Sequence, residues 1–137
     1  MATTTATISL NSANITGDPL SLSKTTTLNK AQSTEGLNQF TGITTLVYAG
    51  AQTATPLVLA ASYANPLVAH KVYIRNTSTS PTDFVNIELG SGNTVLGRLY
   101  AGDWAFLPWD GTNDIDVDTS GALTIEFGVF SQSAVSV

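Results

Sequence analysis

Apolar and polar residues alternate with a period of two along most of the second half of this chain. In HKVYIRN, residues 70–76, Val72 and Ile74 point to one side of an extended backbone, and the residues between them point to the other. Residues 83–90 and 122–130 repeat the pattern. A period of two is the signature of a β-strand with one buried and one exposed face. The pattern therefore predicts strands that cover a core on one side only.

Several such segments follow one another after residue 42, with Gly, Asn, Asp, Ser and Pro between them, as in turns. The predicted strands are residues 43–50, 55–61, 70–76, 83–90, 94–100, 103–109, 114–118 and 122–130. No helical periodicity intervenes, so successive strands are expected to pair in antiparallel fashion. We therefore expect an all-β fold: an antiparallel β-sandwich, in the form of a jelly roll of about eight strands.

The first 42 residues differ from the rest because they are polar and rich in threonine. Ala6, Ile8 and Leu10 alternate with polar residues, and a turn-rich stretch separates them from Leu20 and Leu22. This pattern predicts an N-terminal β-hairpin or arm. Residues 29–42 show no sustained period and read as a connection. The expected division is an arm and connection over residues 1–42 and a β-sandwich domain over residues 43–137.

Composition removes several classes of function. The 137 residues include no cysteine, which excludes disulfides, thiolate metal sites and cysteine nucleophiles. His70 is the sole histidine, and no serine lies in a strand-to-helix elbow. The net charge of −5 disfavours nucleic acid as a partner. With no leader and no membrane segment recognised, we expect a soluble protein that is made in a cytoplasm and binds no membrane. With no recognisable catalytic arrangement, we also expect that it is not an enzyme and needs no cofactor.

Three aspartates lie two residues apart in the segment that reads DIDVD, and their spacing resembles the start of a calcium loop. The sixth position of such a loop is Thr119 rather than Gly, and the twelfth is Ile125 rather than Glu. A strand explains the spacing better, because the residues between the aspartates then face the core. The sequence predicts a solvent-facing acidic row with no metal, which a basic partner surface would complement. These candidate interface residues are Asp114, Asp116 and Asp118.

Both tryptophans lie in residues 103–109, where Trp104 and Phe106 share one face of the predicted strand. Buried tryptophans would fill the core, whereas exposed ones would anchor a protein interface or stack on a sugar ring. Asp103 and Asp110 flank them as a conceivable acid pair, but both occupy turn sequences, which account for aspartate without catalysis. The aromatic candidates for an interface are Trp104, Trp109 and Tyr100.

The succession of segments from Leu46 to Phe130 carries a resemblance. It runs through VYIRNTSTSPTDFVNIELG, then GRLYAGDWAFLPWDG, an acidic strand and a closing LTIEFGVF. This order of strands around an AGD turn resembles small jelly-roll virion proteins of tailed bacteriophages, namely capsid decoration (cement) proteins and fibre-associated modules. The resemblance supplies no contact motif, so no binding residue is carried over from it.

The resemblance implies a non-enzymatic virion protein on the outer surface of the capsid. Such a protein would bind between capsomers of the major capsid protein, stabilise the assembled head and form a homotrimer. The alternative is a receptor-binding or carbohydrate-binding module at a tail fibre or spike. That module would use exposed aromatic residues such as Trp104, Trp109, Tyr100 or Tyr63 as stacking platforms, with calcium at the aspartates.

Overall fold

The computed structural model describes residues 3–17, 19–63, 69–90 and 92–132, and within these the chain is all-β, as the periodicity predicts. The helical segments of the described residues are two 3-10 turns, η1 (Ile15–Gly17) and η2 (Ala60–Tyr63). In that part of the chain, no helix has the length and apolar character needed to cross a membrane. The start of the expected arm, residues 1–2, and the end of the expected sandwich domain, residues 133–137, lie outside the described residues.

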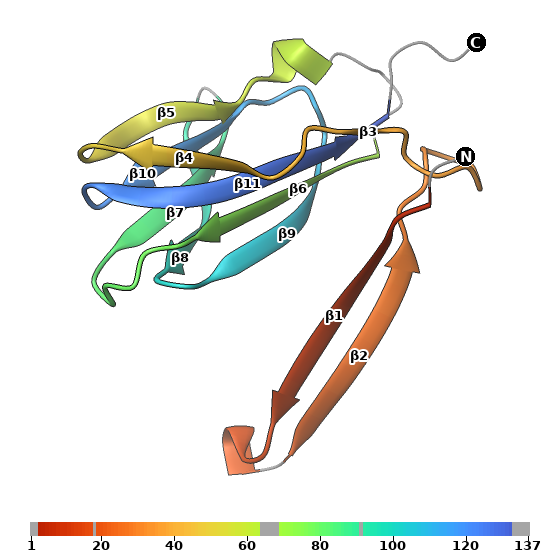
Figure 1. The fold of residues 1–137 in the computed structure, drawn as a ribbon, viewed down its shortest axis with the longest axis horizontal. Helices are drawn as coiled ribbons and strands as arrows, with labels where there is room; N and C mark the ends of the chain where they lie inside the picture. Colours follow the sequence, from red (N-terminus) through yellow and green to blue (C-terminus); the bar gives the residue numbers. More distant parts are fainter. Residues whose placement is uncertain (1–2, 18, 64–68, 91, 133–137) are drawn as a thin grey trace.

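All eight predicted strands are present and form two antiparallel sheets packed face to face (Figure 1). Sheet 1 has the order β3-β11-β6-β9, with β4 also paired to β11, and sheet 2 has the order β5-β10-β7-β8. The sandwich strands are β3 (Gln39–Phe40), β4 (Thr44–Tyr48), β5 (Gln52–Val58), β6 (His70–Asn76), β7 (Phe84–Leu89), β8 (Thr94–Tyr100), β9 (Trp104–Trp109), β10 (Ile115–Thr119) and β11 (Leu123–Ser131). The predicted antiparallel β-sandwich is confirmed.

The core lies between the inner faces of the two sheets, and the alternation in the sequence places its residues correctly. Val72 and Ile74 of β6 are fully buried, as are Ile115 and Val117 of β10. Their neighbours in the sequence lie on the two outer faces. Close packing of these branched side chains fixes the register, because a slip by one residue would turn every apolar side chain outward.

The N-terminal hairpin projects from one end of the sandwich as an arm (Figure 1). Its strands, β1 (Thr5–Ser12) and β2 (Leu20–Thr27), pair over their whole length. At the base, the Leu28 amide donates to the Thr4 carbonyl at 2.8 Å, and the Leu28 side chain is only 3% exposed. We call the hairpin Thr5–Thr27 the arm.

The connection between the arm and the sandwich is fastened to sheet 1. The Ala31 amide donates to the Gln132 side chain at 2.9 Å, and the short strand β3 pairs with β11. Thr41 exchanges hydrogen bonds with the backbone of Val129. The base of the arm is therefore held against the sandwich, whereas its strands make extensive contacts only with each other.

Deletion of residues 1–27 is expected to leave the sandwich folded, because β1 and β2 contribute little to the core. Thermal unfolding followed by near-UV circular dichroism should remain cooperative, with a Tm lowered by no more than about 4 °C, or about 1 kcal/mol. As a control, Ile74→Ala should cost about 2–5 kcal/mol, because Ile74 is fully buried between the sheets. Loss of cooperative unfolding after the deletion would instead make the arm part of the folding unit.

Candidate functional site

Five aromatic side chains gather on the outer face of sheet 1. Phe130 stacks on Phe40 with ring centroids 4.2 Å apart and meets the edge of Phe106 at 6.1 Å. Phe106 lies opposite Tyr73 in the pairing of β9 with β6, and Trp104 follows on the same side of β9. We call this set the aromatic face: Phe40, Tyr73, Trp104, Phe106 and Phe130.

A glycine makes this arrangement possible. Gly128 lies on the outer side of β11, where a Cβ atom would come within 2.9 Å of the Phe40 ring and 3.0 Å of the Gly42 carbonyl. A Cβ atom is essentially never found as close to another atom as the first of these distances, and the second is tighter than most real Cβ contacts. The absent side chain lets residues 40–43 lie close against β11, where Phe40 stacks on Phe130.

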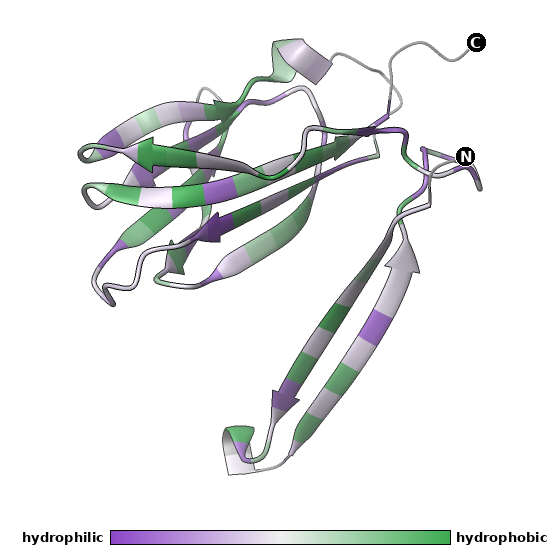
Figure 2. Ribbon diagram, in the orientation of Figure 1, coloured by the Kyte–Doolittle hydropathy of each residue, from purple (hydrophilic) through white to green (hydrophobic). Residues whose placement is uncertain are grey.

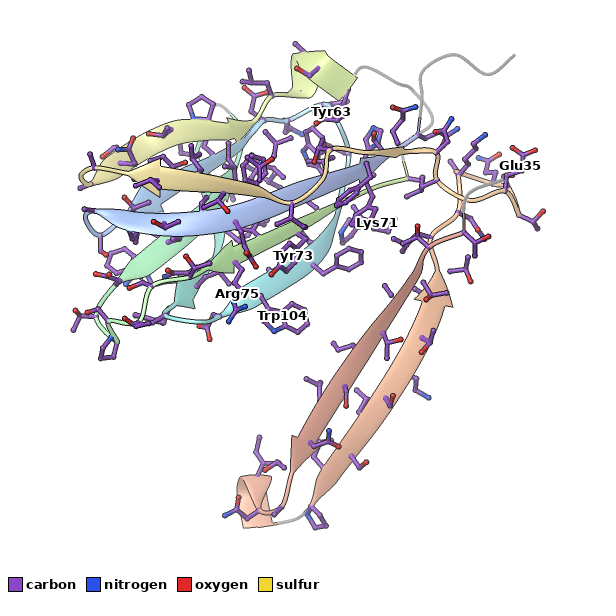
Figure 3. The ribbon with its side chains drawn as sticks, viewed as in Figure 1. Glu35, Tyr63, Lys71, Tyr73, Arg75 and Trp104 are labelled. Carbon is purple, nitrogen blue, oxygen red and sulfur yellow. The ribbon has the colours of Figure 1, made fainter. Side chains whose placement is uncertain are left out.

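The arm and the aromatic face enclose an open cleft of about 630 Å³. On one side it is lined by the basal half of the arm, including Ala6 and Ile8, and on the other by Tyr73, Trp104 and Phe106. Figure 3 shows Tyr73, Arg75 and Trp104 on the side of the sandwich that is turned toward the arm. Both walls of the cleft therefore include apolar side chains.

Large apolar side chains around the cleft remain exposed. Trp104 is 51% exposed and Phe106 36%, while Ile8 and Leu10 on one face of the arm are 41% and 42% exposed. The alternation of apolar and polar residues along both strands of the arm is visible in Figure 2. Contiguous apolar surface of this kind marks binding sites on soluble proteins.

The charged side chains that line the cleft are basic, against the acidic balance of the whole chain. Lys24 of the arm and Arg75 of β6 both line it. Tyr73 donates its hydroxyl to Glu126 at 2.7 Å, and burial followed by this carboxylate raises the pKa of Tyr73. Tyr73 therefore stays protonated and acts as a donor. The cleft joins aromatic surface to positive charge, a combination suited to acidic or apolar protein segments.

The other predicted aromatic residues lie elsewhere. Trp109 is 4% exposed; its indole N–H donates to the Asn113 carbonyl at 2.6 Å, and its ring packs against Tyr63 and His70. The sequence leaves open whether Trp109 lies in the core, at a protein interface or under a sugar ring, and the structure places it in the core. Tyr100, 46% exposed, lies on β8 of sheet 2. Among the aromatic candidates, only Trp104 belongs to the aromatic face.

The acidic row is less solvated than the sequence suggests. Asp116 is only 9% exposed, and Asp114 and Asp118 are half-buried, so the expectation of a fully solvent-facing row is wrong. The pairing of β10 with β5 beside the row is irregular, and its register shifts twice. Asp118 Oδ1 accepts the Ala54 amide at 2.6 Å, at a residue with φ of +47°. The Asp118 side chain thus gives the Ala54 amide a hydrogen-bond acceptor at a place where the pairing of the two strands is irregular.

Asp114 has a corresponding role at the other end of β5. Its Oδ1 accepts the Ala60 amide at 2.7 Å, where the turn η2 begins. The two outer aspartates of the row thus fix the β5 edge of sheet 2. Sequence reasoning missed this role, because the bulges of β5 have no signature in the residues of β10.

Like charges face one another at the centre of the row. Asp116 lies directly opposite Glu88 of β7, which is 4% exposed. Burial, and then the charge and hydrogen bond of Asp118, raise the pKa of Glu88; burial and the neighbouring aspartates raise the pKa of Asp116. These carboxyl groups therefore hold protons more readily than in an unfolded chain. Within the described residues, no group of three or more acidic or histidine side chains is placed to hold a metal ion.

Asp103 and Asp110 have the turn roles that their sequences predict. Asp103 Oδ2 accepts the Tyr100 amide at 2.9 Å. Although burial acts in the opposite sense, hydrogen bonds from Thr112 and Asn113 lower the pKa of Asp110 to about 2. Both carboxylates are engaged by local backbone and do not share a cleft.

Comparisons of the chain with protein families, with curated proteins and with solved structures gave no match.

Asp118→Ala is expected to lower the free energy of unfolding by about 1–3 kcal/mol, because the Ala54 amide would lose its acceptor. Asp118→Asn should cost less, since it keeps an acceptor oxygen and removes a charge beside Glu88. Urea unfolding of the two variants provides the measurement. If both variants lost the same free energy of unfolding, the effect would come from the charge of Asp118 rather than from its hydrogen bond.

His70 is expected to make the protein less stable in mild acid. The His70 side chain is 1% exposed, and burial lowers its pKa. The Lys71 charge lowers this pKa further, whereas a hydrogen bond with the Tyr63 backbone and the charge of Asp110 act in the opposite direction. Below pH about 6.5 the unfolded chain therefore takes up a proton more readily, and stability falls until the lower native pKa is reached.

Glu88 and Asp116 act in the opposite sense. Their raised pKa values give stability that is present below about pH 4 and is lost as the pH rises through the native pKa. Urea unfolding between about pH 4.5 and 7.5 should therefore show less loss on acidification in His70→Gln and more in Glu88→Gln. Identical pH profiles for both variants would contradict these assignments.

Proposed function

We propose that this chain is a non-enzymatic virion structural protein that acts by binding protein surfaces, with an eight-stranded jelly roll as its body. The strand orders β4-β11-β6-β9 and β5-β10-β7-β8 support the jelly roll, because consecutive strands from β4 to β7 and from β8 to β11 alternate between the two sheets.

The single observation that carries the proposal is the open cleft between the arm and the aromatic face. Exposed Trp104 and Phe106 on one wall and exposed Ile8 on the other are costly to leave in water. Tryptophan and tyrosine with a basic neighbour such as Arg75 are the side chains that dominate protein interfaces. The surface is thus suited to permanent contact with another polypeptide.

A capsid decoration protein is the specific form of this proposal. It would sit on the outer surface of the head and bind the major capsid protein at junctions between capsomers. A protein that binds only the assembled lattice stabilises that lattice by mass action. Several copies joined as a homotrimer would dissociate far more slowly than one, because their footprints act together.

A carbohydrate-binding module of a tail fibre is the second candidate. The observation in its favour is the exposed ring of Trp104, which together with Phe106 offers a platform on which a sugar could stack. The aspartates that would hold calcium in that function lie on or next to β10 of sheet 2, whereas this platform lies on β9 of sheet 1. Glycan-array binding would favour the module over the decoration protein.

Trp104→Ala is expected to weaken binding to DNA-filled heads of the phage that encodes the chain by at least about tenfold, as at an interface hot spot. Tyr100→Ala is the matched control: it is a similarly exposed aromatic residue on the other sheet and should change binding by less than about threefold. Cosedimentation with the heads measures both. No sedimentation of the unaltered protein with heads, together with glycan binding that requires Trp104, would replace the decoration function with the second candidate.

A further inference from the structure

Each copy of this chain carries two uncovered apolar surfaces. One is the aromatic face, from which Trp104 and Phe106 project into the cleft. The other is the apolar side of the arm, on which cross-strand pairing places Leu10 beside Leu22 and Ile8 beside Lys24. A two-stranded ribbon is only marginally stable in water without cover for its apolar side.

The two surfaces of one copy do not cover each other. The basal residues Ala6 and Ile8 line the cleft, but Leu10, Leu20 and Leu22 lie farther along the arm and are not among its lining residues. The arm extends away from the sandwich toward its tip (Figure 1), while its base is fastened through Leu28 and Ala31. The apolar side of the distal arm thus lies beyond the reach of its own aromatic face.

Charge permits the arm of a second copy at this place. The chain has a net charge of −5, so two copies repel each other over most of their surfaces. The strand residues of the distal arm, 9–12 and 20–23, carry no charge, and the charged side chains that line the cleft are Lys24 and Arg75. The distal arm therefore meets no like-charge repulsion from the cleft, and apolar contact decides whether it binds there.

We propose that the cleft receives the distal apolar side of the arm of a second copy, with Leu10, Leu20 and Leu22 of that copy against Trp104 and Phe106. The contact joins different surfaces of the two copies, so repetition gives a ring where the rotation between copies closes and a filament where it does not. The proposed homotrimer is the smallest such ring beyond a reciprocal pair. The inference rests on the proposed function, since it names the partner at the same cleft.

Cross-linking tests the contact directly, because the chain has no cysteine of its own. Leu10→Cys and Arg75→Cys variants, carrying tags of different mass, are mixed at micromolar concentration and treated with a short bis-maleimide. The expected product joins Leu10→Cys of one copy to Arg75→Cys of another. Ser9→Cys is the matched control, because Ser9 points to the opposite side of the arm, and it should give at least tenfold less of this product.

Three outcomes would overturn the inference. The first is equal cross-linking from the Ser9→Cys and Leu10→Cys variants. The second is a cross-link formed only within one chain in a Leu10→Cys, Arg75→Cys double variant, which would mean that the arm closes on its own sandwich. The third is a monomer mass by light scattering of the unaltered chain at the same concentration. Trp104→Ala should abolish the interchain product while leaving the circular dichroism spectrum unchanged, and persistence of the product would also count against the inference.

Head binding separates this inference from the proposed function. If the interchain product is absent but binding to heads persists and depends on Trp104, the cleft holds a shell segment, and only the inference fails. If the product forms and the unaltered protein does not bind heads, the copies exchange arms and the decoration function fails instead.

Discussion

Packing of branched apolar side chains between the two sheets is the interaction on which the rest of this structure depends. Val72, Ile74, Ile115 and Val117 are fully buried there. Because neighbouring residues of a strand point in opposite directions, filling the inner faces forces every intervening residue onto an outer face. One outer face becomes aromatic, and the other carries aspartates beside a bulged edge. The difference between the two outer faces thus follows from which residues separate the core positions.

The sequence predicted the inward residues well, because a period of two is a local property. It also placed Trp104 and Phe106 on one side of β9. It did not predict that Phe40 stacks on Phe130, since that contact joins strands ninety positions apart in the chain. The close approach of residues 40–43 also depends on the absence of a side chain at Gly128. Trp109 illustrates the same limit. Its identity is equally compatible with the core and with an interface, and only its surroundings in the fold, which include Tyr63 and His70, assign it.

Burial within the sandwich disfavours the charged forms of its ionisable groups. Burial lowers the pKa of His70, and it raises those of Glu88 and Asp116, so each group resists becoming charged. The two effects oppose each other in mild acid, where histidine protonation destabilises the fold and carboxyl protonation relieves repulsion. Asp118 is tolerated beside Glu88 because its oxygen satisfies the Ala54 amide. A structural hydrogen bond therefore explains a charge that would otherwise be unfavourable on sheet 2.

The sandwich also determines how a partner can bind. Added strands need a free edge with regular donors, and the edge strand β9 carries Pro108, which has no amide hydrogen to donate. The edge strand β8 is interrupted by a register shift opposite Ile87. Strand addition is therefore disfavoured at these two edges of the sandwich. The aromatic face and the arm combine exposure with apolar area, and the proposed assembly would use both of them.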